Sequence, residues 1–463
     1  MKRLVRSVRE SWGRHTVANP FGGRLRWSFA SLLALLVGLH SSIVSGELIP
    51  TPDFSSHSIP TTQVPSGSGL AWEYLDVAIL VVALSLASYF ALVTRSRRHL
   101  FLLSFASLVW FGFVRQGCVC SIGATQNVAL AIFDNGYVIP LSVVAFFLLP
   151  LLFTLFFGRT FCAAVCPLGA IQEFVSVKNV QVPRWVDHSL GLMTWIYLGA
   201  AVIFSATGTA FLICRYDPFV GFFRLGGNAN MMIAGGVLLL VGVFVGRPYC
   251  RYLCPYGAVL SVFSRFSRFH VRIPPTQCIT CGLCSEACPY GAIESPVSRA
   301  TPVEASRGRR RLGYLLVAAP LIVVAFAGLG AMMRGPLSRM DPEVQLAEQL
   351  RMETLGLTAT TTDASEAFRN ARRDERALLE KVLVTQERFR WLGVALGAWI
   401  GVVISVKLVS LAVRRPHADY RADTKNCVSC GRCFWYCPVP DGKAPGVTPT
   451  TGPTEPSQLV QIT

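Results

Sequence analysis

Four cysteines follow one another closely in Cys278-Ile-Thr-Cys281-Gly-Leu-Cys284-Ser-Glu-Ala-Cys288-Pro289. The spacing C-x2-C-x2-C-x3-C-P places three thiolates on one iron–sulfur cluster and leaves the last cysteine for a different cluster. Soft thiolates also select zinc, but structural zinc sites space their ligands differently. Structural zinc, or thiols without a ligand role, is the alternative interpretation. The run therefore predicts a [4Fe-4S] site.

A second run has the same spacing, Cys427-Val-Ser-Cys430-Gly-Arg-Cys433-Phe-Trp-Tyr-Cys437-Pro438, with glycine in the same slot. Two such runs are the pattern of two-cluster bacterial ferredoxins, in which each run gives its last cysteine to the other run's cluster. We therefore expect two [4Fe-4S] clusters. Their expected ligands are Cys278, Cys281, Cys284 and Cys437 for one, and Cys427, Cys430, Cys433 and Cys288 for the other.

The composition is that of a membrane protein. The chain has 463 residues, of which 52% are hydrophobic and only 15% are charged, which is unusual for a soluble chain of this length. The net charge is +17, but Arg and Lys gather at the ends of apolar stretches rather than in a patch for nucleic acid. We expect membrane lipid as a partner and no nucleic acid. Eight of the 15 cysteines lie in the two runs, which indicates a reducing compartment there.

Apolar stretches of about 20 residues, long enough to cross a bilayer, recur along the chain. They lie at 27–44, 73–94, 99–114, 137–157, 190–213, 229–245, 312–333 and 391–413. The prediction is a mainly α, polytopic membrane protein with about eight transmembrane helices in a bacterial cytoplasmic (inner) membrane. A small α+β ferredoxin-like two-cluster module is expected to be split across the last two spans. The first stretch is expected to be an uncleaved anchor, with a cleaved signal peptide as the alternative.

The distribution of Lys and Arg orients these spans. Both termini and both cysteine runs are expected on the cytoplasmic side, which the exchange of last cysteines requires. The expected units are a basic terminus 1–26, a membrane domain 27–245, a cytoplasmic segment 246–311, a membrane hairpin 312–413, the second run in 414–440 and a disordered tail 441–463. The outer segment 334–390 is expected to be helical, with a capping pair at Asp363 and Glu366 and a helix at 342–356.

An internal repeat is formed by two further motifs, Gly158-Arg-Thr-Phe-Cys162-Ala-Ala-Val-Cys166-Pro167 and Gly246-Arg-Pro-Tyr-Cys250-Arg-Tyr-Leu-Cys254-Pro255. The C-x3-C spacing places two sulfurs about one helical turn apart on one face. Four such thiolates suffice for a further cluster or another soft metal, and they could also work as reversible dithiols. Alternatively, Cys-Pro simply ends a helix before a turn. Each copy follows an apolar span, so both are expected at the cytoplasmic surface.

A degenerate third copy is Gly117-Cys118-Val-Cys120-Ser-Ile-Gly-Ala-Thr125. The predicted topology places Cys118 and Cys120 in the outer compartment, where they could form a redox pair or ligate a metal, and Cys214 lies on the same side. The Ser-Ile-Gly-Ala-Thr segment is similar to sequences around covalently flavinylated threonines. It has an inserted Ile and no preceding Asp, so covalent FMN is not expected. The sequence contains no C-x-x-C-H haem motif, dinucleotide fingerprint or P-loop.

Taken together, these motifs resemble the NosR/NapH-type membrane polyferredoxins, over about residues 75–440. The resemblance implies [4Fe-4S] clusters on the eight cysteines of the two runs. It implies an electron-transfer component of a respiratory system rather than a stand-alone enzyme. A quinol- or ferredoxin-linked donor and a periplasmic acceptor are the implied redox partners. The chain departs from the family pattern by splitting the two runs around a membrane hairpin.

Two other functions fit the same residues. One is a redox or metal sensor that signals through the outer segment 334–390, because some members of the family are described as regulators. The other is an accessory protein that handles copper for a metalloenzyme through the C-x3-C and C-x-C thiols. The first interpretation, electron relay to a reductase, is the one we favour from the sequence.

Overall fold

The computed structural model describes residues 69–438 apart from 118–119, 135, 178–179, 227, 274–277, 299–300, 359–360, 372–373, 414–415 and 418. The predictions for the basic terminus, the first apolar stretch, Cys118 and the tail 441–463 lie outside the described residues. Within the described part of the chain, nearly all regular structure is helical, as predicted.

Helices occupy every predicted apolar stretch that falls in the described residues. Four of them are long and apolar enough to cross a membrane, namely α3 (Leu70–Leu92), α9 (Arg184–Ala206), α16 (Pro302–Met332) and α20 (Glu375–Ala412). The others are shorter: α6 (Leu141–Phe157), α12 (Ala229–Phe244), and α4 (Arg97–Ser107) with the π-helical segment η1 (Leu108–Val114). The structure therefore gives four candidate spans within the described residues, fewer than the sequence predicted.

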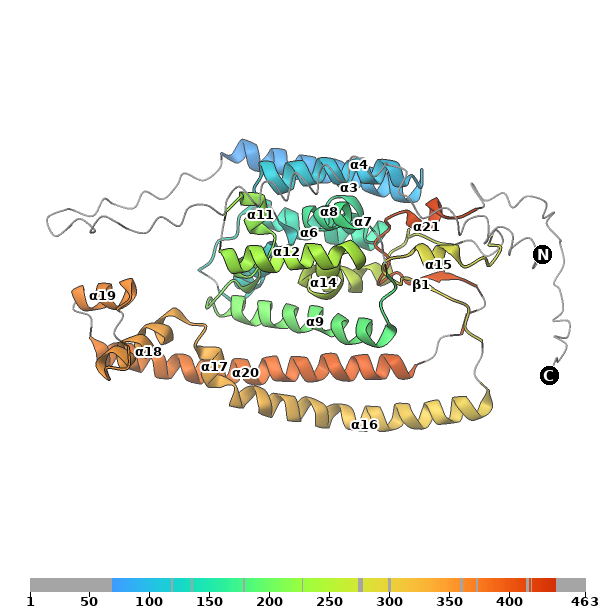
Figure 1. Cartoon of the computed structure of the whole chain (residues 1–463). Coiled ribbons are helices and arrows are strands. Elements are labelled where there is room, and N and C mark those ends of the chain that lie inside the picture. The colour runs from blue at the N-terminus through green and yellow to red at the C-terminus, as the bar shows by residue number, and fades with distance from the viewer. Residues whose placement is uncertain are drawn as a thin grey trace.

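The segments after α6 and α12 turn back into the helix bundle. The chain continues as α7 (Thr160–Ala164) and α8 (Pro167–Val175) after α6, and as α13 (Pro248–Tyr252), α14 (Pro255–Phe263) and the 3-10 turn η2 (Ser264–Phe266) after α12. Leu168 and Leu260 are fully buried in the same apolar core as Leu84 of α3. The C-x3-C-P motifs thus lie inside the helix bundle (Figure 1), and their expected position at the cytoplasmic surface of the membrane stays a prediction.

Three further helices complete the bundle. The helix α5 (Ser121–Phe133) packs against α6 and α9, and the short helices α10 (Leu212–Arg215) and α11 (Val220–Arg224) connect α9 to α12. α11 lies toward the end of the bundle that carries the outer segment (Figure 1).

Helices α16 and α20 form a hairpin along one side of the bundle (Figure 1). Small residues let the two backbones approach closely, as in many membrane helix pairs. A Cβ at Gly397 would lie 2.0 Å from the carbonyl oxygen of Phe326. The hairpin is anchored to α9 because Trp399 Nε1 donates to the carbonyl oxygen of Trp195 at 2.7 Å.

The segment between the hairpin helices is helical, as predicted, and comprises α17 (Arg334–Ser338), α18 (Pro342–Thr354) and α19 (Asp363–Asn370). Leu350 of α18 packs with Phe368 of α19 and Leu378 of α20. The capping pair of α19 is Thr362 with Ser365. The predicted pair, Asp363 with Glu366, is wrong because the helix begins one residue earlier in the register and its hydroxyl groups take the capping role.

The two cysteine runs meet at one end of the bundle, opposite α18 and α19 (Figure 1). Their segments contain α15 (Leu283–Ala287), β1 (Ile293–Glu294), β2 (Arg421–Ala422) and α21 (Arg432–Trp435). β1 and β2 pair antiparallel, with Ile293 opposite Ala422. An isolated bridge between Val297 and His417 extends the pairing. The halves separated by the hairpin thus form one small α+β module, as the sequence predicted.

Candidate metal centres

The two cysteine runs adopt the same backbone shape. Thr280 and Ser429, at equivalent positions, both have φ of 54°, and the glycines two residues later, Gly282 and Gly431, have φ of 80° and 75°. Left-handed backbone suits glycine but is uncommon for Thr and Ser. Such strain persists where the surroundings require it, commonly at ligand sites. Both turns are therefore shaped for the same purpose.

The cysteines group across the two runs. The charge of Cys437 acts on Cys284, together with the charges of the neighbouring cysteines in the first run. The charge of Cys288 acts on Cys433 in the same way. The strongest cysteine charge acting on Cys288 is that of Cys430, from the other run. The charge of Cys284 also acts on Cys433, so the two groups adjoin, and the exchange of last cysteines stays a prediction.

We name the two groups by the run that supplies three of their members. The first-run site comprises Cys278, Cys281, Cys284 and Cys437, and the second-run site comprises Cys427, Cys430, Cys433 and Cys288. Burial raises the pKa of Cys284 to about 11 and that of Cys427 to about 12. A buried thiolate needs a compensating positive charge, and a bound metal supplies it while displacing the thiol proton. The donor sets therefore fit iron–sulfur clusters.

No group of three or more His, Cys, Asp or Glu side chains among the described residues lies close enough to hold a single metal ion. A four-iron cluster does not impose that requirement, because each thiolate binds a different iron.

The internal repeat gathers its four sulfurs in one buried place, which we call the four-cysteine site (Cys162, Cys166, Cys250 and Cys254). Cys166 and Cys254 are the N-caps of α8 and α14, and a proline begins each helix. Proline suits this first position because its missing N–H has no helical partner there. Cys166 and Cys254 are buried, and the charges of the other three cysteines act on Cys166.

Polar groups of the surrounding helices donate to these sulfurs. The donors are the N–H of Gly257 to Cys254 Sγ at 3.3 Å, Gln172 Nε2 to Cys250 Sγ at 3.4 Å, and Arg159 Nη2 to Cys162 Sγ at 3.8 Å. The Gln172 amide is held in place because its Oε1 accepts the N–H of Tyr249 at 3.0 Å. Hydrogen bonds to sulfur favour the thiolate and tune the potential of a bound cluster.

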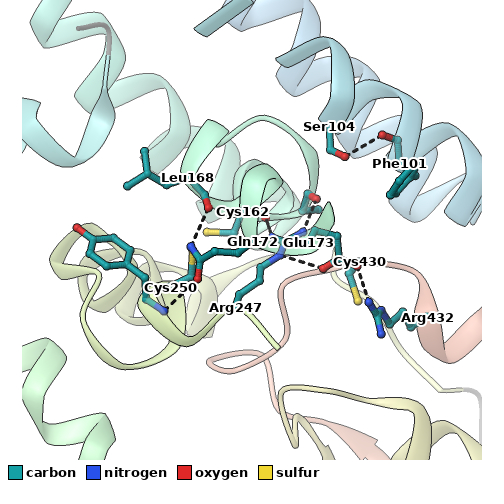
Figure 2. A network of polar contacts seen from close by, with 12 residues as sticks. Phe101, Ser104, Cys162, Leu168, Gln172, Glu173, Arg247, Cys250, Cys430 and Arg432 are labelled. Carbon is teal, nitrogen blue, oxygen red and sulfur yellow. Dashed lines mark hydrogen bonds and ion pairs between the residues drawn. The ribbon is translucent and has the colours of Figure 1, made fainter. Parts of the chain in front are cut away.

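Glu173 links this site to the second cysteine run (Figure 2). Its carboxylate pairs with Arg247 Nε at 3.1 Å, with Arg432 Nη2 at 2.6 Å, and with Arg97. We call these four residues the Glu173 node. Burial alone would raise the pKa of the Glu173 carboxyl, but the three guanidinium groups hold that pKa well below its ordinary value. Three arginines and one carboxylate leave the node with a net charge of +2.

Arginines of the node also hold the backbone of the cysteine motifs. Arg97 Nη1 donates to the carbonyl oxygen of Cys430 at 2.9 Å. Arg247 donates to the carbonyl oxygens of Cys162 and Ala163, in the latter case at 3.1 Å. The node therefore positions the second-run site and the four-cysteine site relative to each other.

Two more arginines bind the module to the bundle. Arg159 Nη1 donates to the carbonyl oxygen of Lys425 at 2.8 Å. Arg251 Nη1 donates to the carbonyl oxygen of Pro289 at 2.8 Å, while its Nε pairs with Asp187. Both belong to the C-x3-C-P motifs, so each motif carries a contact to one cysteine run.

Cys120 lies next to the four-cysteine site and is not isolated from it. Cys120 and Cys166 line the same cavity, together with apolar residues such as Phe111. The charge of Cys120 acts on Cys166. The sequence placed Cys118 and Cys120 in a separate outer group; the structure brings Cys120 beside the inner cysteines, and Cys118 lies outside the described residues.

Comparison with known sequences defines the class of the protein. A family described as "4Fe-4S binding domain" matches twice, over residues 139–185 and 228–274, so that it covers both C-x3-C-P motifs. A second family with the same description matches residues 271–294, which contain the first cysteine run. The chain thus contains 4Fe-4S binding domains, and no solved structure matches it.

Several curated proteins match part of the chain. The chain is 31% identical over 163 residues to the putative electron transport protein YccM of Escherichia coli K12, covering 32% of this chain and 44% of that protein. It is 32% identical over 146 residues to the regulatory protein NosR of Pseudomonas aeruginosa, covering 28% and 20%. It is 28% identical over 150 residues to the methylamine utilization ferredoxin-type protein MauN of Paracoccus denitrificans, covering 31% and 52%.

These relatives confirm the predicted resemblance to NosR-type ferredoxin proteins of the membrane, and they support an iron–sulfur electron-transfer role. The chain spans less than half the length of YccM and about half the length of MauN.

Sequence reasoning missed the residues that join the cysteine sites. Glu173 and Gln172 are fully buried polar residues of α8, yet in the sequence they look like ordinary helix residues after Cys166. A signal was present in the repeat itself, because Arg159 and Arg247 occupy the same slot in both copies. An arginine next to a buried cysteine motif needs a buried partner, and that partner is far away in the sequence.

Proposed function

We propose that the protein carries electrons at the membrane, with one [4Fe-4S] cluster on the first-run site and one on the second-run site. The four-cysteine site is proposed to hold a third metal centre, since its two halves match 4Fe-4S binding domains. When bound, such clusters supply reversible one-electron chemistry with little rearrangement.

The observation that carries this proposal is the contact between the second-run site and the four-cysteine site. Cys162 packs against the small core of the module, which includes Val428 and Cys427. The Glu173 node holds both sites from one carboxylate. A chain that only stored iron would not need two distant cysteine groups fixed side by side inside a helix bundle.

The surrounding residues have defined tasks in this proposal. Gln172, Gly257 and Arg159 donate to sulfur atoms and stabilise the thiolate form. The positive node lies beside negatively charged thiolate sites and favours added electrons in both. The buried packing of Cys166 and Cys254 excludes water from the four-cysteine site.

We also propose a location for the protein and a route for its electrons. We propose an inner-membrane location with the module and both termini cytoplasmic. A quinol- or ferredoxin-linked protein would donate electrons, and a respiratory reductase system on the periplasmic side would accept them. The four apolar helices and the NosR-type relatives support a membrane protein. The family names support redox partners in general.

A regulatory function is the second candidate, because one relative is named a regulatory protein. In that case the clusters would report the redox state through the hairpin to α17–α19, without net electron delivery. Loss of electron delivery on removal of Cys254, with the module's clusters intact, favours the carrier. Unchanged delivery together with an altered regulatory output favours the sensor.

Anaerobic purification of the full chain tests the proposal. Iron and acid-labile sulfide are counted, and electron paramagnetic resonance is recorded after reduction with dithionite. We expect at least two [4Fe-4S] signals. The iron content should be lower than in the wild type when Cys250 and Cys254 are both replaced by Ser. An iron-free preparation from cells that assemble other iron–sulfur proteins would overturn the proposal.

A further inference from the structure

The cysteine motif of α13–α14 has a degenerate counterpart in α10 and the turn that follows it. The stretch Cys214-Arg-Tyr-Asp217-Pro218-Phe219 matches Cys250-Arg-Tyr-Leu-Cys254-Pro255-Tyr256, with one residue fewer and with Asp in place of the cysteine before proline. The arginine lies over the ring of the following tyrosine in both copies, at 5.8 Å for Arg215 and 5.3 Å for Arg251. The two stretches therefore share sequence and local shape.

The partner segment is duplicated as well. Gln126 is the sixth residue after Cys120, and Gln172 is the sixth residue after Cys166. Gln126 Oε1 accepts the N–H of Ile213 at 2.8 Å, and Gln172 Oε1 accepts the N–H of Tyr249 at 3.0 Å. Ile213 and Tyr249 each directly precede a cysteine, so the two glutamines hold equivalent turns.

The amide nitrogens of the two glutamines differ in their hydrogen bonding. Gln172 Nε2 donates to Cys250 Sγ, in the four-cysteine site. Gln126 is 0% exposed, and its Nε2 has no hydrogen-bond partner within the described part of the chain. In the correspondence, this nitrogen is the counterpart of Gln172 Nε2, and Cys214 is the counterpart of Cys250. The hydroxyl of Ser121, next to Cys120, is also buried without a partner there. Orphaned polar atoms of this kind call for a ligand or a missing acceptor.

Three side chains that can lose a proton, those of Cys120, Cys214 and Asp217, lie around the start of α5. Cys214 approaches α5 closely, since a Cβ at Gly123 would lie 3.4 Å from its Sγ. The charges of Asp217 and Cys214 both act on Cys120. Asp217 is buried, and its Oδ1 accepts the N–H of Phe219 at 2.8 Å, much as Cys254 Sγ accepts a helix N–H. Burial and these like charges raise the pKa of Cys120 to about 12, a cost that a bound cation would remove.

We propose that Cys120, Cys214 and Asp217 form a further metal site, a degenerate copy of the four-cysteine site, which binds one thiolate-preferring transition-metal ion such as zinc or iron(II). Two thiolates and one carboxylate are a donor set for such ions, and they leave one coordination position open. Binding releases the thiol protons to solvent, and no electron is transferred in that step.

The geometry also defines what binding must change. No three such side chains already converge at single-ion distance in the described residues, so binding requires a side-chain rotation. Cys214 is the exposed one of the three side chains and is the one expected to turn. Because Cys120 and Cys166 line one cavity, a metal at this site would adjoin the four-cysteine site.

Cobalt(II) is the probe, because its thiolate complexes absorb strongly and it takes the same ligands as zinc. It is added to the anaerobically purified full chain with its iron–sulfur clusters in place. We expect a thiolate-to-cobalt absorption band with a stoichiometry of about one. Cys120→Ser, Cys214→Ser and Asp217→Asn should each weaken binding at least tenfold. Asp134→Asn, which changes an exposed carboxylate just after α5, should leave the band unchanged.

A second measurement does not depend on variants. Cobalt(II) should protect Cys214 of the wild-type chain from alkylation, as read by mass spectrometry. Equal cobalt binding by the wild type and the three variants would overturn the proposal, as would a Cys120–Cys214 disulfide in the anaerobic protein. These outcomes are independent of electron delivery, since they are read without a redox partner.

Discussion

The two cysteine runs have one spacing and one backbone turn, but the bundle holds them differently. The second run is embedded, with Val428 and Ser429 buried and with Arg97, Arg159 and Arg432 engaged. The first run is held at its edge, and Ile279 and Thr280, at the positions equivalent to Val428 and Ser429, are exposed. Its contacts to the bundle are Arg251 to the carbonyl of Pro289 and Gln181 to carbonyls of α15. The second-run site is thus joined closely to the helix bundle, and the first-run site is the more exposed of the two.

Breaking the exchange of last cysteines has the largest expected effect. Cys437→Ser should remove the cluster of the first-run site, because Cys437 ends the second run but is the fourth ligand of that site. Cys288→Ser should likewise remove the cluster of the second-run site. We expect each variant to lose on the order of four irons, one cluster's worth. Electron paramagnetic resonance of the reduced protein identifies which signal is lost. If each variant loses the cluster of its own run instead, the exchange is wrong.

Changing the Glu173 node comes next. Glu173→Gln leaves three buried arginines without their carboxylate, and breaking a buried pair in this way costs about 3–5 kcal/mol. The node charge rises from +2 to +3, so the second-run cluster should become easier to reduce, while the first-run cluster shifts less. Arg97→Gln should shift the potential the opposite way, and the double variant should return it toward the wild type. Redox titration, monitored by electron paramagnetic resonance, measures the reduction potential of each cluster in the wild type and the variants.

The matched control for the node is Arg98→Gln, which removes the same charge from an exposed neighbouring position of α4. An equal shift in that variant would show that general charge, and not the node, sets the potential.

The pH dependence follows from the sign of the pKa shift. Folding lowers the pKa of Glu173 from its ordinary 4.5, so its stabilising contribution is complete above that pH and decreases as the pH falls below it. Between neutral pH and pH 5 the contribution should stay constant. Acid unfolding curves of the wild type and Glu173→Gln should therefore converge only below about pH 4.5. Convergence already near neutral pH would contradict the assignment.

The hold on the first run can be weakened separately. Arg251→Gln removes a charged donor to the carbonyl of Pro289, which is worth about 1.5–3 kcal/mol. We expect faster alkylation of Cys278 and Cys281 in the cluster-free protein, and little change at Cys430. Equal acceleration at Cys430 would show that both runs are held as one unit.

The smallest effect is expected for Gln181→Ala. Its Nε2 donates to the carbonyl oxygens of Ser285 and Glu286 at 3.1 and 3.2 Å, on an exposed part of the surface. The loss is about 0.5–1.5 kcal/mol, visible as a slight further increase in alkylation of the first run only. A change in the second-run signal would mean that Gln181 acts beyond its two contacts.

The sequence predicts the module well and the membrane interior poorly. Ligand spacing is local, so Cys278 to Cys288 and Cys427 to Cys437 could be read directly, and the need to exchange Cys288 and Cys437 predicted that the halves meet. The packing of α8 and α14 into the bundle could not be foreseen. An apolar segment followed by a Cys-Pro turn has the same sequence pattern whether the next helix leaves the bundle or packs back into it. Glu173 finds its arginine partners through packing of distant segments, which no local pattern records.

The antiparallel pair of β1 and β2 has a consequence for how the protein matures. In the sequence, β1 precedes the α16–α20 hairpin and β2 follows it. The two strands can therefore pair only after both helices are in place and the chain has come back to the same end of the bundle. A chain whose hairpin has not been inserted holds three cysteines of each set and lacks the fourth. Under the proposed cluster assignment, iron loading of the module would therefore require prior insertion of the hairpin.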